Sequence, residues 1–420
     1  MKYENSISFA KEQDVNDPLR SYRGKFYIPK HTDGSDVIYF AGNSLGLQPK
    51  TVRSYVEQEL KDWEVLGVEG HNSAKYPWLP YHEFLTEQTA RLVGAKPPEV
   101  VSMNSLTVNL HLMLVSFYRP TKERSKILIE ANAFPSDHYA VQSQIKFHGF
   151  DPAESLIEMK PRDGEVFIRT DDILELINKE GDSIALIMFA GVNYYTGQAF
   201  EFEKITKAGH EKGCIVGFDL AHAAGNLDMN LHEWDVDFAV WCSYKYLNGG
   251  PGAISGAYVH EKHIRDMSIP KFWGWWGQDK ATRFLMGHNF QPIPTVESWQ
   301  LSNPPILQLA ALRASLDIFD EAGIKNLRMK SESLTGYAEF LINNNNNSPV
   351  EIITPSNPAE RGCQLSLRTG PNGRELHKNL VENGVVCDWR EPDVIRIAPV
   401  PLYNSFEDVY RFVKILMNNE

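Results

Sequence analysis

GFDLAH at 217–222 and CSYK at 242–245 share one pattern, an apolar run followed by a charged residue. Each completes an apolar run, Cys214–Phe218 and Phe238–Cys242, that is typical of a buried strand. Asp219 closes the first strand, and Lys245 follows the second strand 26 positions later. In sheets of parallel strands, ligands bind beyond the carboxyl ends of the strands, so we expect both side chains to face a ligand site.

An acid and a lysine so placed suit the chemistry of pyridoxal phosphate (PLP). A lysine amine can form a Schiff base with the cofactor's aldehyde, and burial helps the amine to lose its charge. A carboxylate facing the pyridine nitrogen keeps that nitrogen protonated, so the ring can accept electrons. We therefore predict that Lys245 binds PLP, that Asp219 faces the ring nitrogen, and that His222 lies beside the ring. The alternatives are a solvated lysine, a helix N-cap and a core histidine.

The composition sets limits on the class of protein. A chain of 420 residues is expected to form two or three domains, and its 42% hydrophobic and 23% charged residues are ordinary for a soluble globular protein. The net charge of −12 argues against a protein that coats nucleic acid or an anionic membrane. The longest apolar run, Ile184–Val192, is about half a membrane span, and the N-terminus has no signal-peptide pattern.

The four cysteines lie far apart and form no C-x-x-C pair. Two of them sit inside apolar runs, which indicates buried free thiols rather than disulfides or a metal site. Free thiols are typical of a reducing compartment, so we expect a cytoplasmic protein without a metal centre.

Short apolar runs alternate with helical segments from about Leu92 to Tyr258. This alternation predicts an α/β fold, with a mainly parallel sheet covered by helices on both faces. The expected strands are Lys126–Glu130, Ser183–Ala190, Cys214–Phe218, Phe238–Cys242 and Ile254–Val259, and the expected helices between them are Asp171–Asn178 and Ile205–Lys212.

The flanking regions indicate further elements. Val52–Trp63 has the periodicity of an amphipathic helix, and a long helix is expected after Pro304-Pro305. The asparagine tract Asn343–Asn347 predicts a surface turn between a helix and a strand. We expect an arm and helix over residues 1–60 that contribute to the small domain, a large PLP-binding domain over 61–305, and a small α/β domain over 306–420, with apolar runs at Gln364–Leu367, Val394–Ile397 and Phe406–Met417.

Two other segments could complete a PLP site. Ser105-Leu106-Thr107 precedes the helical run Val108–Phe117, and amides at a helix start bind phosphate. The alternative is plain N-capping by Ser105. FPSD at 134–137 follows the strand that ends at Glu130, so Phe134 could stack on the pyridine ring and Asp137 could lie at the ring edge. The alternative for this segment is a tight turn.

Further motifs follow one another along nearly the whole chain: GNSLG at 42–46, MNSLTVNLH at 103–111, FPSD at 134–137, YTGQ at 195–198, DLAH at 219–222, SYKYLN at 243–248, GW at 274–275, SNPP at 302–305 and RIAP at 396–399. In this set and order the sequence resembles the kynureninases, which are PLP-dependent hydrolases of the aspartate-aminotransferase fold (fold type I). The resemblance implies a seven-stranded-type, mainly parallel sheet in the large domain and a homodimer with shared active sites.

The resemblance also implies roles for single residues. Lys245, Tyr244 and Asp219 would be catalytic. The cofactor would be bound by Leu106, Thr107, Phe134, Pro135, Ser136, Asp137, Ala190, Asp219, His222, Tyr244 and Lys245, and by the partner subunit's Trp275 and the partner subunit's Asn303. Kynureninases often carry a serine where this chain has Ala190, so Ala190 would make a backbone contact at most. The substrate would be bound by Ser44, His71, Ser302, Asn303 and Arg396.

Arg396 resembles the arginine that binds the substrate's α-carboxylate, a task suited to a guanidinium group. A surface salt bridge is its alternative, but Arg396 lies between apolar residues. The implied reaction is hydrolysis of the Cβ–Cγ bond of L-kynurenine or 3-hydroxy-L-kynurenine in tryptophan degradation or NAD biosynthesis. His71, Ser302 and Asn303 resemble the pattern of members that favour the 3-hydroxy form. Tyr244 could relay protons or hold the phosphate.

Other PLP chemistry remains open on the sequence. A cysteine desulfurase would need a nucleophilic cysteine on a mobile loop beyond the lysine, and only Cys363 and Cys387 follow Lys245. An aminotransferase would consume an α-keto acid in a second half-reaction. A PLP-binding sensor or interaction protein with an inactive site is the alternative outside the enzymes, although the acidic chain shows no basic DNA-binding stretch.

Overall fold

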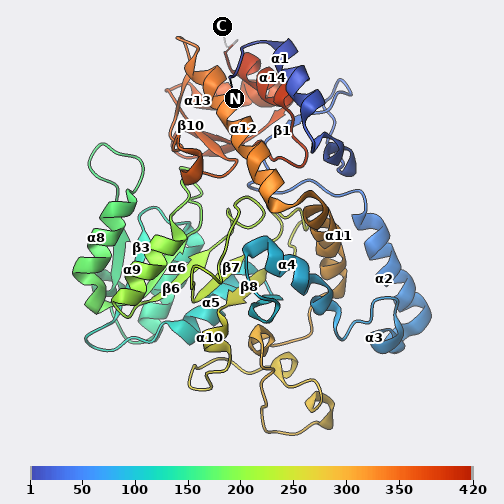
Figure 1. The fold of residues 1–420 in the computed structure, drawn as a ribbon, viewed down its shortest axis with the longest axis vertical. Helices are drawn as coiled ribbons and strands as arrows, with labels where there is room; N and C mark the ends of the chain where they lie inside the picture. The colour runs from blue at the N-terminus through green and yellow to red at the C-terminus, as the bar shows by residue number, and fades with distance from the viewer. Residues whose placement is uncertain (1, 418–420) are drawn as a thin grey trace.

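A seven-stranded sheet forms the centre of the larger part of the molecule in the computed structural model, which describes residues 2–417 (Figure 1). The strand order is β2-β8-β7-β6-β5-β3-β4, and β8 alone runs against the other strands. The bounds are β2 Val100–Ser102, β3 Lys126–Glu130, β4 Leu156–Met159, β5 Ile184–Ala190, β6 Ile215–Asp219, β7 Phe238–Trp241 and β8 Gly256–Val259. The predicted α/β class and mainly parallel sheet are confirmed.

All five predicted strands occur, with ends that differ by two residues or fewer. The prediction missed two strands, β2 and β4. β2 has three residues, and β4 is an edge strand with one buried residue. Neither strand therefore has the long apolar run on which the prediction relied.

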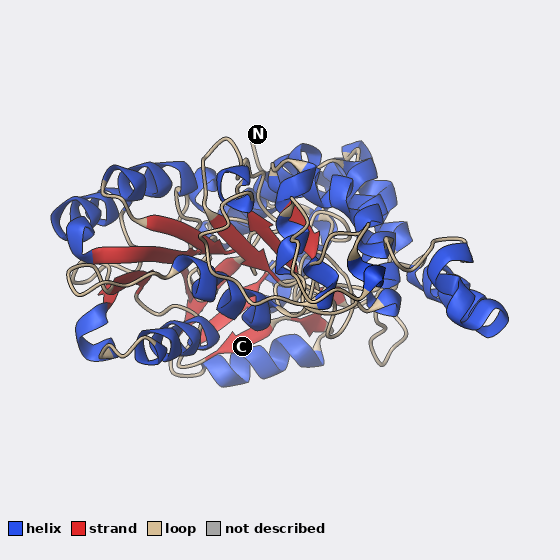
Figure 2. Cartoon of the chain, turned by 90° about the horizontal axis from the view of Figure 1, so that it is seen from below, coloured by secondary structure: helices blue, strands red, loops and turns tan. Residues whose placement is uncertain are grey.

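Helices cover both faces of this sheet, as Figure 2 shows. Side chains of each strand alternate between two hydrophobic clusters: Ile127 and Ile129 belong to one, and Leu128 to the other. The first cluster also takes residues of α5 and α6, and the second takes residues of α8, α9 and α11. These helices are α5 Leu106–Phe117, α6 Pro135–Phe147, α8 Thr170–Glu180, α9 Phe202–Glu211 and α11 Ile306–Ala322. The predicted helices at 171–178, 205–212 and after Pro305 are confirmed.

The smaller part contains a four-stranded antiparallel sheet in the order β12-β13-β10-β9. Its strands are β9 Val350–Ile352, β10 Leu365–Thr369, β12 Asp388–Arg390 and β13 Val394–Ile397, and its helices are α12 Ile324–Asn343, α13 Gly373–Glu382 and α14 Phe406–Met417. The N-terminal arm joins this part: α1 (Ile7–Asn16) packs on α14, and β1 (Ile38–Tyr39) pairs with β11 (Val385–Val386). The asparagine tract leads from α12 to β9, as predicted.

Packing also indicates where the two parts meet. The predicted amphipathic helix forms α2 (Val52–Leu66), which packs along α11. The buried hydrophobic residues of α11 join a cluster of the larger part, whereas those of α12 from Leu334 onward join the cluster of the smaller part. The division at 60 and 305 stays a prediction, and this packing favours placing α11 with the larger part.

The remaining elements are short. They are α3 Gly70–Ser73, α4 Thr86–Val93, α7 Pro152–Ser155 and α10 Glu261–Ile264, with 3-10 turns at Arg20–Lys25, Gly67–Glu69, Tyr81–Leu85, Pro97–Glu99, Gly181–Ser183, Trp275–Gly277, Arg283–Leu285, Val296–Trp299 and Pro358–Glu360. Residues 265–303 form an excursion with little regular structure at the bottom of Figure 1. Among residues 2–417, no helix combines the length and apolar character that crossing a membrane requires.

Candidate active site

The strands β5, β6 and β7 end at a common cavity of about 80 Å³. Its position at the carboxyl ends of parallel strands is the one that this type of sheet uses for ligands. The cavity is lined by Leu106, Thr107, Phe134, Ser136, Asp137, Ala190, Val192, Tyr194, Asp219, Ala221, His222, Tyr244 and Lys245. The structure therefore brings together ten of the residues predicted to bind the cofactor, from segments more than 100 positions apart in the sequence.

Lys245 lies in the middle of this set. Its Nζ is 3.1 Å from His222 Nε2 and 5.8 Å from the centroid of the Phe134 ring. Both strand ends lead into turns rather than helices, so Asp219 does not cap a helix. Asp219 Oδ1 does accept a hydrogen bond of 2.7 Å from Ala221 N, so one carboxylate oxygen stabilises the local turn.

His222 is buried and presents an unpartnered atom. Its pKa lies well below the usual value, because burial and then the nearby Lys245 disfavour the charged ring. When Lys245 Nζ donates to Nε2 of this neutral ring, the ring proton lies on Nδ1. Among the described residues Nδ1 has no hydrogen-bond partner. A buried donor without an acceptor is costly, which indicates that a ligand atom belongs there.

Three buried carboxyl groups meet at the strand ends. Burial raises the pKa of Glu130 to about 8. Burial, followed by the charges of Asp219 and Glu130, raises the pKa of Asp137 well above its usual value. Burial also raises the pKa of Asp219, although the Ala221 amide and Lys245 act against it. Because like charges so close cannot all ionise, Asp137 in its protonated form can donate to Asp219 and leave Asp219 as the anion.

Two helices begin at the same cavity. Leu106 opens α5 and Pro135 opens α6, and the hydroxyl oxygens of Thr107 and Ser136 lie 3.0 Å apart. Ser105 makes no side-chain cap for α5, so plain capping does not explain this sequence. The alternative of a tight turn at 134–137 is wrong, because this segment starts the 13-residue helix α6. Free amides at helix starts beside two hydroxyl groups can bind a phosphate.

These observations fit PLP. Lys245 supplies an amine for the covalent link, Asp219 an anion for the pyridine nitrogen, and Phe134 an aromatic face. The helix starts supply donors for the phosphate, and His222 Nδ1 supplies a donor that lacks an acceptor. Pro135 does not line the cavity and acts by starting α6.

Arg396 lies next to this cavity on the smaller sheet. Its side chain is 1% exposed, so the alternative of a surface salt bridge is wrong. Nη1 donates to the carbonyl oxygen of Tyr194, a cavity residue, over 2.7 Å. Nη2 contacts Asp388 and is 3.3 Å from Ser44 Oγ. Ser44 and Arg396, predicted to bind one substrate, are therefore neighbours.

Besides Pro135, Ser44 and Arg396, four predicted site residues do not line the cavity of this chain. His71 of α3 hydrogen-bonds to Val68 O, and Trp275, which is 45% exposed, lies in the 265–303 excursion. Ser302 and Asn303 are exposed just before α11. Their roles were predicted for a shared site and stay predictions.

Sequence reasoning missed several residues of the site: Glu130, Val192, Tyr194 and Asp388. Glu130 is the last residue of β3, and the segment Val192–Tyr194 comes soon after the end of β5. Both positions could therefore have been found from the predicted strand ends. Asp388 had no such signal. Its contact with Arg396 depends on the pairing of β12 with β13, in which the two residues face each other.

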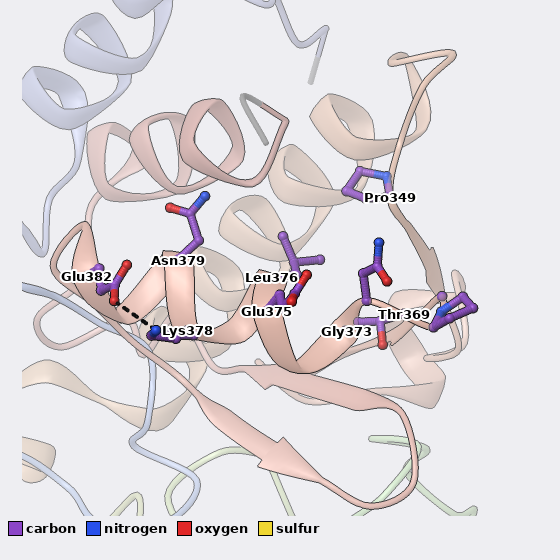
Figure 3. A pocket seen from close by; sticks show the side chains of 11 residues that line it. Pro349, Thr369, Gly373, Glu375, Leu376, Lys378, Asn379 and Glu382 are labelled. Atoms are coloured by element: carbon purple, nitrogen blue, oxygen red, sulfur yellow. Dashed lines mark ion pairs between the residues drawn. The ribbon is translucent and has the colours of Figure 1, made fainter. Parts of the chain in front are cut away.

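Other hollows and clusters do not share this chemistry. A groove of about 830 Å³ runs beside α13 in the smaller part, and Figure 3 shows its lining side chains with the Lys378–Glu382 ion pair. It contains no predicted site residue. Two groups of histidine and glutamate, Glu99 with His232 and His260 and His82 with Glu83 and Glu297, have donor atoms close enough for a metal ion. In each group a histidine–glutamate hydrogen bond already joins the donors.

Comparisons with known proteins point in one direction. The family model described as the kynureninase C-terminal domain matches residues 327–416. The curated kynureninase of Koribacter versatilis (strain Ellin345) is 63% identical over 417 residues, which cover 99% of this chain and 98% of the relative. The kynureninase of Mus musculus is 52% identical over 422 residues, which cover 96% and 91%.

Solved structures resemble the chain in fold. A cysteine desulfurase from Thermococcus onnurineus NA1 has a TM-score of 0.75 at 18% identity and covers 91% of this chain and 94% of its own. A C-DES variant with glycine linked covalently to its PLP cofactor has a TM-score of 0.77 at 16% identity and covers 94% and 98%. At such identities the likeness shows the fold alone, that of PLP-dependent fold type I enzymes.

Proposed function

The chain belongs to the kynureninase family, and we propose that the cavity around Lys245 is its active site. The protein is a PLP-dependent hydrolase of a carbon–carbon bond in tryptophan degradation. It cleaves the Cβ–Cγ bond of L-kynurenine or 3-hydroxy-L-kynurenine and releases L-alanine with anthranilate or 3-hydroxyanthranilate. The observation that supports this site best is the meeting of Lys245, Asp219 and His222 at the strand ends, next to Arg396.

The proposed roles follow from the geometry. When bound, PLP supplies a sink for electrons released at the substrate's Cα. Asp219, as the anion of the carboxyl cluster, holds the proton on the pyridine nitrogen. Arg396 binds the α-carboxylate and so turns the Cα–H bond toward Lys245, whose Nζ accepts that proton.

Tyr244 lines the cavity one residue before Lys245. Burial raises the pKa of its hydroxyl, so the group keeps its proton at neutral pH. Such a hydroxyl can donate to the phosphate, or can pass a proton while water adds to the γ-carbonyl. We propose one of these two roles for Tyr244, and a loss in cofactor affinity or in turnover on Tyr244→Phe would separate them.

The cysteines argue against desulfurase chemistry. Burial raises the pKa of Cys363 to about 12 and that of Cys387 to about 12, whereas a nucleophile needs the thiolate. Burial likewise raises the pKa of Cys242 to about 11. None of these thiols lines the cavity. The chain therefore shares its fold with the cysteine desulfurase structure, but none of these three cysteines is placed to act as a nucleophile at the cavity.

The substrate preference and the assembly are further proposals. We infer a homodimer in which the partner subunit's Trp275, the partner subunit's Asn303 and neighbouring residues complete each site. Exposed aromatic side chains on the 265–303 excursion, with Trp273 67% exposed, support such an interface. A histidine and an asparagine beside the substrate ring would favour the 3-hydroxy form, as His71 and Asn303 suggest. The four free cysteines support a cytoplasmic location.

The deciding experiment compares PLP-loaded wild-type protein with Lys245→Ala. We expect the wild type to form alanine and the aromatic amine from L-kynurenine or 3-hydroxykynurenine, and the ratio of efficiencies to report the preference. Lys245→Ala should lose at least a thousandfold in turnover, because general acid–base catalysis contributes roughly 10²–10⁴-fold and covalent binding is lost as well. Lys126→Ala, at the amino-terminal end of β3 and so at the other end of the strands, is the matched control. Turnover by Lys245→Ala would refute the assignment.

A further inference from the structure

Arg396 does not face its substrate alone, because a carboxylate of the same chain already contacts its guanidinium group. Asp388 and Arg396 are direct partners across the antiparallel strands β12 and β13. The Asp388 side chain, 10% exposed, contacts Arg396 Nη2 and also accepts from Ser44 Oγ. Strand register therefore places Asp388 against Arg396.

Three acceptors define the plane of the guanidinium group. Nη1 donates a hydrogen bond to the carbonyl oxygen of Tyr194 on the cavity wall. Nη2 donates to Asp388 and to Ser44 Oγ. These partners come from three separate segments: the loop after β5, strand β12, and the loop after β1. A guanidinium held in this way keeps one orientation, which a bidentate hydrogen bond to a carboxylate requires.

The cluster also has a spare positive charge. Arg390, on the same strand as Asp388, places Nη1 2.9 Å from Asp388 Oδ1 and Nη2 3.0 Å from Oδ2. Among the described residues, Asp388 is the one acid that pairs with either Arg390 or Arg396. Two guanidinium groups thus share one carboxylate, and Arg396 Nε has no hydrogen-bond partner within residues 2–417. One further carboxylate would neutralise the cluster and supply an acceptor.

We propose that Asp388 is a positioning residue for carboxylate recognition: it holds the Arg396 guanidinium in place and divides its charge with Arg390, so that the site takes a ligand with a single carboxylate. This inference rests on the proposed function and deepens it. Asp388 acts through Arg396 and does not touch the substrate. The charges of Arg396 and Arg390 also reach the cofactor side, since both contribute to lowering the pKa of His222 after burial and Lys245.

The test compares PLP-loaded wild type with Asp388→Asn, which removes the charge and keeps the size. We expect the KM for L-kynurenine to rise about tenfold, the effect of losing one hydrogen bond between charged groups, with kcat changed less than about twofold. The affinity for L-alanine, followed by the absorbance of the bound cofactor, should fall by a similar factor. The amine derived from kynurenine by loss of the carboxylate should bind as it does to wild type.

Asp393→Asn is the matched control. Asp393 lies in the turn between β12 and β13 and accepts from Tyr195 OH, but it does not contact Arg396. We expect this variant to keep the wild-type KM. In an Arg396→Lys background, Asp388→Asn should have little further effect, because the residue acts through Arg396.

Each other result overturns the proposal. An unchanged KM would mean that Asp388 does not position Arg396, and a lower KM would mean that it competes with the substrate. An equal loss for the amine would mean a general structural defect. If wild type made no product from kynurenine, the proposed function would fail, but the L-alanine measurement would still decide the role of Asp388.

Arg390→Gln separates charge from geometry. It leaves Asp388 on Arg396 but removes the spare positive charge. We expect L-alanine to bind about threefold more weakly, which is the size of effect typical of a partly exposed ion pair. The amine that lacks the carboxylate should bind as it does to wild type. Unchanged binding of L-alanine would show that the spare charge plays no part in recognition.

Discussion

At the residue scale, the site depends on which buried carboxyl group carries the negative charge. Glu130, Asp137 and Asp219 lie close enough for the charge of one to shift the pKa of another. Only an ionised Asp219 can hold a proton on the pyridine nitrogen, so the other two groups serve the site best as neutral acids. Burial is the largest cause of both raised pKa values, and within residues 2–417 no positively charged group pairs with Glu130.

Glu130 gives the clearest prediction at this scale. Because burial raises its folded pKa to about 8 from 4.5, the stability contributed by the protonated acid is complete below about pH 4.5 and is lost as the pH rises through 8. Glu130→Gln removes this titration and keeps an acceptor for Ala190 N. The variant should therefore gain stability relative to wild type between pH 5 and pH 8, by roughly 1.4 kcal/mol for each pH unit.

Urea unfolding of the two PLP-loaded proteins at a series of pH values measures this difference. Glu158→Gln, on the neighbouring strand β4, is the control, since its side chain is 40% exposed. A stability difference between wild type and Glu130→Gln that stays constant with pH would contradict a protonated Glu130.

At the element scale, five of the seven strands of the large sheet could be predicted because each contains a short, mainly apolar run. The strand Lys126–Glu130 was predicted with both of its ends. The predicted strand ends located Asp219, Lys245 and Phe134, and the predicted start of a helix located Leu106. Asp388 could not be predicted, because strand register depends on contacts between segments and leaves no local pattern. The edge strand β4 was not predicted, because few of its residues are buried and its sequence has no long apolar run.

At the amino-terminal ends of β6 and β7, away from the cavity, one buried carboxylate joins several elements. Asp237, which precedes β7 and is 1% exposed, accepts from His210 of α9, His263 of α10 and Val216 N of β6. Burial alone would raise the pKa of Asp237, but hydrogen bonds from His210 and His263 and the charge of Lys262 outweigh it and hold the pKa below its usual value. One carboxylate thus ties two helices to two strands.

Asp237→Asn should lower the free energy of unfolding by about 3 kcal/mol at pH 7, because it leaves buried donors without their anion. Since the folded pKa is depressed, the contribution of Asp237 is present above its unfolded pKa near 4 and is lost as the pH falls further. The penalty should therefore shrink below about pH 4, as urea unfolding would measure. Asp235→Asn, an exposed neighbour with the same kind of partners, should cost less than about 1 kcal/mol. Equal penalties for both variants would contradict this account.

At the scale of the whole molecule, the question is whether one chain holds a complete site. The cavity around Lys245 is lined by residues of one chain, and Arg396 approaches it from the smaller part. Of the residues expected around the substrate ring, His71 lies in α3. Ser302 and Asn303 lie just before α11, at the end of the 265–303 excursion with its exposed aromatic side chains. In a twofold dimer, the same surface of each subunit could complete the other's site.

Hybrid dimers test this arrangement. Lys245→Ala removes the lysine of its own site, and Asn303→Ala removes a residue that we assign to the partner's site. A hybrid of the two variants then contains one site with both defects and one intact site, so hybrids purified through two different tags should show about half the wild-type activity. Each variant alone should be far less active.

Hybrids of Lys245→Ala with Asp219→Ala are the control. They carry a defect in every site, because both residues line the same cavity, and should stay inactive. If the first hybrid were no more active than the mean of its parents, Asn303 would serve the site of its own chain and the shared-site arrangement would be wrong.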